Sequence, residues 1–151
     1  MIQLLQTKSA VPLNNLFYLP IYDKMTNTDY TPLFGFTSQL SKKTLYACAT
    51  FATYTDKDRY VKLQMFTVGS GTPAPEDGIV TMGTTDYPYG WYDTTIYQNT
   101  SDDNLDPDGL TQIWAGLMNL EPQDNPAVEY NEYTANDSDI ESVYITNKPN
   151  N

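Results

Sequence analysis

The sequence predicts an all-β fold, an antiparallel β-sandwich of about eight or nine short strands. Ten prolines are spread over the 151 residues and leave few windows long enough for a helix. The windows between them are rich in β-branched and aromatic residues, and turn-like residues separate them at short intervals. Short strands spaced in this way are typical of sandwiches, and both an immunoglobulin-like and a jelly-roll arrangement fit.

The chain is expected to form one domain with short extensions. Its length is that of an ordinary domain, and a content of 40% apolar residues, with 13% aromatic, supplies a core. We expect an N-terminal arm or edge strand at residues 1–12, the sandwich at 13–146 and a disordered tail at 147–151. The first thirteen residues have no basic region, and no apolar run reaches bilayer length, so we expect a soluble protein without a secretion signal.

The first strands are expected as a meander at residues 33–40, 44–55 and 59–68, separated by the turns "SKK" and "DKD". In the third, apolar and polar residues alternate with a period of two, at Val61, Leu63 and Met65 and at Lys62 and Gln64. This alternation predicts one face on the core and the other in water.

The later strands are expected after a loop rich in Gly and Pro, at residues 79–82, 91–100, 110–120, 127–134 and 141–146. The segment 110–120 is ambiguous because its apolar residues also have helical spacing. Gly116 lies in its middle and helix-favouring charges are absent, so we favour a strand.

The composition excludes several kinds of catalysis. Histidine is absent and Cys48 is the single cysteine, which leaves no ligands for zinc chemistry and no Ser-His or Cys-His pair. Cys48, within "LYACAT", is interpreted as a buried strand residue rather than a reactive thiol. Paired carboxylates could serve a glycosidase, but the sequence singles out no pair among 19 acids. We expect no enzyme activity, cofactor or small-molecule ligand.

The net charge of −11 opposes binding to nucleic acid and to anionic membranes. Basic residues gather only at Lys42 and Lys43 and at Lys57, Arg59 and Lys62, which we interpret as solvated turns and strand edges. The lack of cysteine pairs fits synthesis in a reducing cytoplasm.

The segment "NLDPDG" resembles the start of a calcium loop. Asn104, Asp106 and Asp108 alternate and Gly109 follows, as oxygen ligands do in such loops. The twelfth position, which should be a carboxylate, is Ala115. A solvated Asp-Pro-Asp-Gly turn is therefore favoured, and calcium binding is left as the alternative.

The richest aromatic stretch is the strand from Trp91 to Gln98. Its alternation places Tyr92, Thr94 and Ile96 on one face, and it places Trp91, Asp93, Thr95 and Tyr97 on the other. Both faces carry bulk, and Tyr and Trp are enriched at protein interfaces. The excess of 13 Tyr over 5 Phe favours partner contact as well, because buried hydroxyls need hydrogen-bond partners. The predicted partner-contact residues are Trp91, Tyr92, Tyr97, Trp114, Tyr130 and Tyr144.

The order of these segments resembles a group of small structural proteins of tailed bacteriophages. The matching stretches are "RYVKLQMFTV" (59–68), "GIVTM" (78–82), "GWYDTTIYQNTSDDNLDPDGL" (90–110), "IWAGLMNL" (113–120) and "VEYNEYT…SVYI". Gln98 and Trp114 depart from the group, where acidic residues are usual. The resemblance implies a β-sandwich component of the capsid or of the neck and tail, without catalytic residues.

We therefore expect a non-enzymatic virion protein, made in the host cytoplasm, that binds capsid, portal, neck or tail proteins and copies of itself through aromatic faces and terminal arms. Its acidity favours a position away from packaged DNA. The alternative is a carbohydrate-binding module for host recognition, in which Trp91, Tyr92 and Tyr97 stack on sugar.

Overall fold

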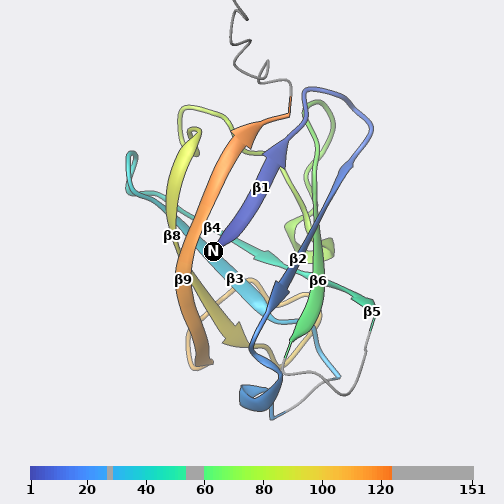
Figure 1. The fold of residues 1–151 in the computed structure, drawn as a ribbon, viewed down its shortest axis with the longest axis vertical. Helices are drawn as coiled ribbons and strands as arrows, with labels where there is room; N and C mark the ends of the chain where they lie inside the picture. The colour runs from blue at the N-terminus through green and yellow to red at the C-terminus, as the bar shows by residue number, and fades with distance from the viewer. Residues whose placement is uncertain (27–28, 54–59, 124–151) are drawn as a thin grey trace, which may run out of the picture.

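Two β-sheets packed face to face form the described part of the chain (Figure 1). A computed structural model of the 151 residues describes residues 1–26, 29–53 and 60–123. Nine strands lie in this part: β1 (Ile2–Gln6), β2 (Leu13–Leu19), β3 (Leu33–Ser38), β4 (Thr44–Cys48), β5 (Thr50–Thr53), β6 (Val61–Thr67), β7 (Ile79–Val80), β8 (Gly90–Gln98) and β9 (Thr111–Pro122). Two short 3-10 turns, η1 (Tyr22–Lys24) and η2 (Pro75–Asp77), connect them.

The strand order is that of an immunoglobulin-like sandwich. One sheet has the order β1-β9-β8-β3-β4 and the other β2-β6-β5, with β7 also paired to β6. The run β9-β8-β3-β4 corresponds to G-F-C-C′ in the immunoglobulin arrangement, and β2-β6-β5 corresponds to B-E-D. The predicted all-β sandwich is thus confirmed. Two pairings, β1 with β9 and β6 with β7, are parallel instead of antiparallel.

The predicted elements differ from the observed ones at two places. The strand β2 was not among the expected elements, because its apolar residues occur at both odd and even positions, although their burial alternates in the structure. The expected strand 44–55 is two strands, because the chain leaves the first sheet after Cys48 and enters the second at Thr50. The expected strands 127–134 and 141–146 lie outside the described residues. The segment at Thr111–Pro122 is a strand, as favoured over a helix.

The core lies between the sheets and is built around three phenylalanines. Phe17 meets Phe34 edge to face with ring centroids 5.6 Å apart, and Phe34 stacks on Phe36 at 5.7 Å. Such ring pairs stabilise a core beyond the area they bury. The alternation predicted for β6 is confirmed, because Val61, Leu63 and Met65 are buried and the residues between them are partly exposed.

The two sheets are joined along one side by the side chain of Asn15. Figure 1 shows β1 and β2 side by side there, although they belong to different sheets. The Asn15 amide pairs with the backbone of Leu5: its Oδ1 accepts from the Leu5 N–H at 2.8 Å and its Nδ2 donates to the Leu5 carbonyl at 3.2 Å. Thr67 Oγ1 donates to the same carbonyl at 2.6 Å. These bonds occupy the backbone N–H and carbonyl of Leu5, which would otherwise be free on the edge strand β1 to pair with another chain.

Candidate functional site

The outer face of the five-stranded sheet carries the exposed rings that the sequence singles out. Along β8 the burial alternates as predicted, with Tyr92, Thr94 and Ile96 inside. The outward side chains are Trp91, Asp93, Thr95 and Tyr97. This alternation follows from the two-residue period of a strand and from an apolar core on one side only.

Trp91, Asp93 and Leu117 form a compact surface patch, which we call the Trp91 face. Trp91 is 45% exposed and Leu117, on β9, is 43% exposed. Asp93 lies directly opposite Leu117 across the two strands and follows Trp91 by two positions, so the three side chains are neighbours. The Asp93 carboxylate accepts a hydrogen bond of 2.9 Å from Gln39 Nε2. The patch is apolar with a single negative charge at its centre.

Two further rings on the outer face of this sheet, Tyr46 and Tyr97, are partly buried by their neighbours. The Tyr46 ring of β4 lies across Gly35, where a Cβ would come within 2.9 Å of it, and beside Thr95. Burial raises the pKa of the Tyr46 phenol, and the nearby Tyr97 and Asp106 act in the same direction. Tyr97 is partly buried. The Tyr46 and Tyr97 side chains are both less exposed than that of Trp91.

The prediction that Tyr92 contacts a partner is wrong, because its side chain is 0% exposed. Its hydroxyl donates a 2.6 Å hydrogen bond to the carbonyl of Pro88, four residues upstream. An inward tyrosine near the start of this strand, bonded to the backbone just before it, is the tyrosine corner of immunoglobulin-like sandwiches. Burial raises its pKa to about 12. Tyr92 fixes the corner of the fold and has no free surface for a sugar or a protein.

The side chain of Trp114 also packs against the core and is not fully exposed to solvent. It is partly buried and packs against the core cluster. Its indole covers Gly116, where an added Cβ would lie 2.2 Å from the ring. This close approach explains the glycine in the middle of β9. The remaining predicted contact residues, Tyr130 and Tyr144, lie outside the described residues.

In the acidic loop after β8, polar side chains form hydrogen bonds with the backbone of the loop itself. Asn104 Oδ1 accepts from the Asp106 N–H at 3.1 Å, and Asp106 Oδ1 accepts from the Asp108 N–H at 3.0 Å. These bonds are Asx turns, in which a side chain satisfies the backbone two residues on. Gly109 adopts the left-handed conformation (φ 76°) that ends the loop. Over residues 1–26, 29–53 and 60–123, no three His, Cys, Asp or Glu side chains gather as a metal site would need.

Cys48 lies beneath this loop. It is buried, as predicted, and its Sγ interacts with Asn99 Nδ2 and the Asn104 carbonyl, each at 3.5 Å. Burial raises the pKa of the thiol to about 11.

We expect Cys48 to resist alkylation while the chain is folded. Because the thiolate is the reactive form, a pKa two units above the ordinary value lowers its fraction about 100-fold at pH 8. Iodoacetamide labelling, followed by intact mass, should therefore be at least about 100-fold slower in buffer than in urea. Equal rates would contradict the buried position.

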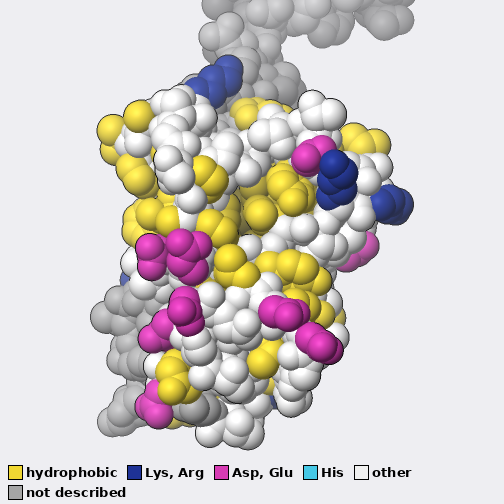
Figure 2. All heavy atoms as spheres, turned by 180° about the vertical axis from the view of Figure 1, so that it is seen from behind, with side chains coloured by type: hydrophobic (Ala, Val, Ile, Leu, Met, Phe, Trp, Pro, Cys, Tyr) yellow, Lys and Arg dark blue, Asp and Glu magenta, His cyan; other side chains and the backbone are white. Residues whose placement is uncertain are grey.

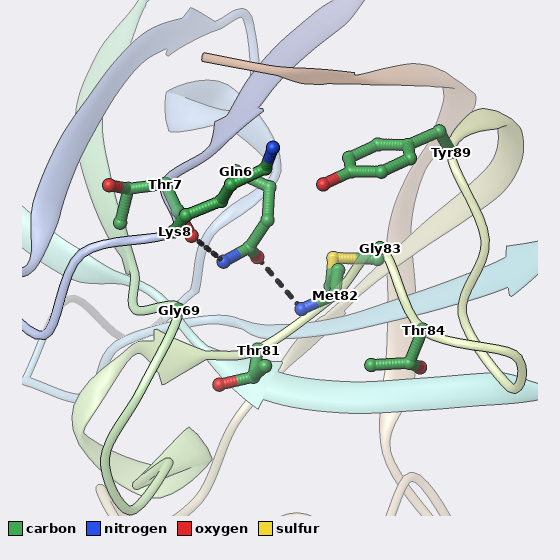
Figure 3. Close-up of a pocket in the computed structure, with 9 residues that line it drawn as sticks. All are labelled: Gln6, Thr7, Lys8, Gly69, Thr81, Met82, Gly83, Thr84 and Tyr89. Atoms are coloured by element: carbon green, nitrogen blue, oxygen red, sulfur yellow. Dashed lines mark hydrogen bonds between the residues drawn. The ribbon is translucent and has the colours of Figure 1, made fainter. Parts of the chain in front are cut away.

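A cavity of about 260 Å³ opens at the end of the sandwich, between the ends of β1, β6 and β7. Figure 3 shows the Gln6 amide on one side and the Tyr89 ring on the other. Gln6 Nε2 donates to the carbonyls of Thr7 (2.7 Å) and Val68 (3.0 Å), and Gln6 Oε1 accepts from the Met82 N–H (2.8 Å). Its lining includes one charged residue, Lys8, and no carboxylate. The Gln6 amide acts here as a structural join, and the cavity holds no acid-base pair.

Acidic side chains outnumber basic ones in this chain, by 19 to 8. Seen from behind, they are scattered over the lower half of the molecule, with apolar side chains between them, while the basic ones lie mainly in the upper part (Figure 2). Within the described ranges there is one ion pair, Lys43 with Asp86 at 2.5 Å, and both side chains are exposed. Lys43 thus lies in a solvated turn, where the sequence placed it.

Comparisons with protein families, with curated proteins and with solved structures found no match. None of the helical segments in the described residues is long and apolar enough to cross a bilayer.

Several exposed apolar residues were missed by the sequence-based reasoning. Leu16 and Tyr18 lie on the outer face of β2, and Leu117 on that of β9. A signal for the first two was present: in "LNNLFYL" apolar residues occur at both odd and even positions, so one face of the strand cannot hold them all.

Proposed function

We propose that this chain is a non-enzymatic structural protein of a virion that binds other virion proteins, including copies of itself, through the outer faces of its sheets. The observation that carries the binding part is the Trp91 face, where a tryptophan and a leucine remain exposed on the outer face of the sheet. Large rings in such positions commonly anchor protein interfaces. The resemblance of the sequence to phage structural proteins supports the virion part.

The arrangement of the strands supports binding through faces rather than through edges. The β1–β2 side is closed by Asn15, and the free side of β4 is covered near Thr44, whose carbonyl accepts from Tyr87. The N-terminal residues pair with β9 in the same chain. The expected role for terminal arms thus rests on residues after 123, which lie outside the described part.

The experiment compares Trp91→Ala with Tyr89→Ala. We expect Trp91→Ala to reduce incorporation into particles about tenfold or more, because a buried aromatic anchor commonly contributes at least that much. Tyr89 is also an exposed ring, but it lies at the cavity end of the sandwich, so its replacement should leave incorporation unchanged. Incorporation is measured by quantitative mass spectrometry of purified particles, and melting curves verify the fold. Full incorporation of Trp91→Ala would refute this role for Trp91.

A carbohydrate-binding module is the second candidate, with one observation in its favour. Trp91 and Tyr97 point outward from the same strand, about 20 Å apart at roughly 3.3 Å per residue, and the residues between them on that face are Asp93 and the small Thr95. Host polysaccharide should then shift the tryptophan fluorescence of a monomer. Such a shift, together with no binding to virion proteins, would favour this candidate over the structural one.

A further inference from the structure

A second exposed patch lies on the opposite side of the sandwich. Leu16 and Tyr18 project outward from β2 and are 48% and 62% exposed. Lys62 of β6 lies directly opposite Tyr18 across the strand pair. We call Leu16, Tyr18 and Lys62 the Tyr18 face. Because the outer faces of a two-sheet sandwich look in opposite directions, the Tyr18 face and the Trp91 face are on opposite sides of the molecule.

The two faces have the same construction with opposite charge. In each, two exposed apolar side chains lie beside one charged group. This group is Asp93, opposite Leu117, in the first face and Lys62, opposite Tyr18, in the second. Neither charge has an ion-pair partner among the residues that the structure describes. The segment 54–59, which precedes Lys62 in sequence, contains two acids and two bases and so has no net charge of its own.

This opposition of charge decides which contacts between copies are favourable. A symmetric contact of the Trp91 face with itself would bring two Asp93 carboxylates together, and the partly buried Glu121 lies on the same sheet face. A symmetric contact of the Tyr18 face would bring two Lys62 ammonium groups together. A contact between the two different faces instead places Asp93 against Lys62 and buries the apolar side chains of both.

We propose that copies of this chain associate front to back, with the Trp91 face of one copy on the Tyr18 face of the next. The inference rests on the proposed function, because it names a second copy as one occupant of the Trp91 face. A contact between two different faces leaves one of each free at the ends, so it propagates. The product is a closed ring if the rotation per copy closes and a filament if it does not.

The test uses two variants that each remove one face. Trp91→Thr with Leu117→Thr removes the first, and Leu16→Thr with Tyr18→Thr removes the second; threonine keeps the strand propensity, and the positions are exposed. By analytical ultracentrifugation the wild type should form rings or filaments, and each variant alone should be monomeric. An equimolar mixture should give a 1:1 dimer that grows no further, since each variant retains one intact face.

Charge reversal tests the same contact independently of the apolar residues. Asp93→Lys and Lys62→Glu should each weaken association about tenfold or more, and both changes in one chain should restore it, because the reversed charges again face each other. Lys8→Glu, at the cavity end, is the matched control and should have no effect.

Some results would overturn the inference without touching the proposed function. If the variant lacking Leu16 and Tyr18 still assembles, if the mixture remains monomeric, or if the wild type is a monomer at every concentration, front-to-back association is wrong. The proposed function fails separately, when Trp91→Ala is incorporated into particles as well as the wild type.

Discussion

Replacing Tyr92 with Ala is expected to lower the free energy of unfolding by about 3–5 kcal/mol, the usual cost of truncating a buried aromatic ring. The side chain is fully buried between the sheets, so its removal leaves a cavity lined by core residues. It also leaves the Pro88 carbonyl without the hydroxyl that it accepts from. Urea unfolding followed by circular dichroism measures the loss, and in a domain of this size the melting temperature should fall steeply.

Two variants that each remove one hydroxyl from β8 distinguish the contribution of the Tyr92 ring to stability from that of its hydrogen bond. Tyr92→Phe keeps the ring and loses the bond to Pro88, and should cost about 1 kcal/mol. Thr94→Val removes a buried hydroxyl that has no hydrogen-bond partner in the described part of the chain, and should be neutral or stabilising. If Tyr92→Ala cost less than about 1 kcal/mol, or if Thr94→Val were the more harmful of the two deletions, the tyrosine corner described above would be wrong.

The faces of single strands were predictable from the sequence because they depend on local alternation. In β8 and β6 the inward and outward residues follow the two-residue period, and both strands are as expected. The choice between strand and helix was ambiguous for β9, where the apolar residues also have helical spacing. In β9, Gly116 lowered the helical propensity and correctly favoured a strand, but its packing reason, the indole of Trp114 above it, depends on tertiary structure.

The role of an inward ring could not be predicted from alternation alone. The pattern placed Tyr92 and Trp91 on opposite faces but did not indicate which face meets the other sheet. That choice depends on long-range contacts, here the packing of Tyr92 in the same core cluster as Phe34 and Phe36. The excess of tyrosine also misled in this case, because the hydroxyl of Tyr92 finds its partner in the backbone of its own corner.

The pairing of the two surface patches was equally beyond the sequence. Leu16 and Leu117 are separated by about a hundred positions, and neither stretch is unusual in composition. Only the topology shows that they project from opposite sheets, each beside one charge of opposite sign. Local patterns report which side chains are exposed, whereas the relation between two exposed patches is a property of the fold.

Replacing Gln6 with Ala is expected to cost about 2–4 kcal/mol, because it leaves three backbone groups, those of Thr7, Val68 and Met82, without their partner. Gln6 is buried and joins the ends of three strands, so its loss should loosen the end of the sandwich. Gln3→Ala is the matched control: it changes the same residue type on the same strand at an exposed position, and should stay within about 0.5 kcal/mol.

Gln6→Glu adds a pH dependence whose sign the hydrogen bonds determine. A carboxylate can still accept from the Met82 N–H, but it cannot donate to the two carbonyls that Gln6 Nε2 now serves. The neutral acid is therefore favoured in the folded chain, and its pKa there lies above the value of about 4.3 in the unfolded chain. Below about pH 4.3 the Gln6→Glu variant should therefore keep most of its stability relative to wild type. As the pH rises above this value, the variant should lose stability, because the buried acid must remain protonated or ionise and lose the proton that it donates. Melting temperatures of both proteins at pH 4 and pH 8 measure this, and an equal difference at both would contradict the donor role of Gln6.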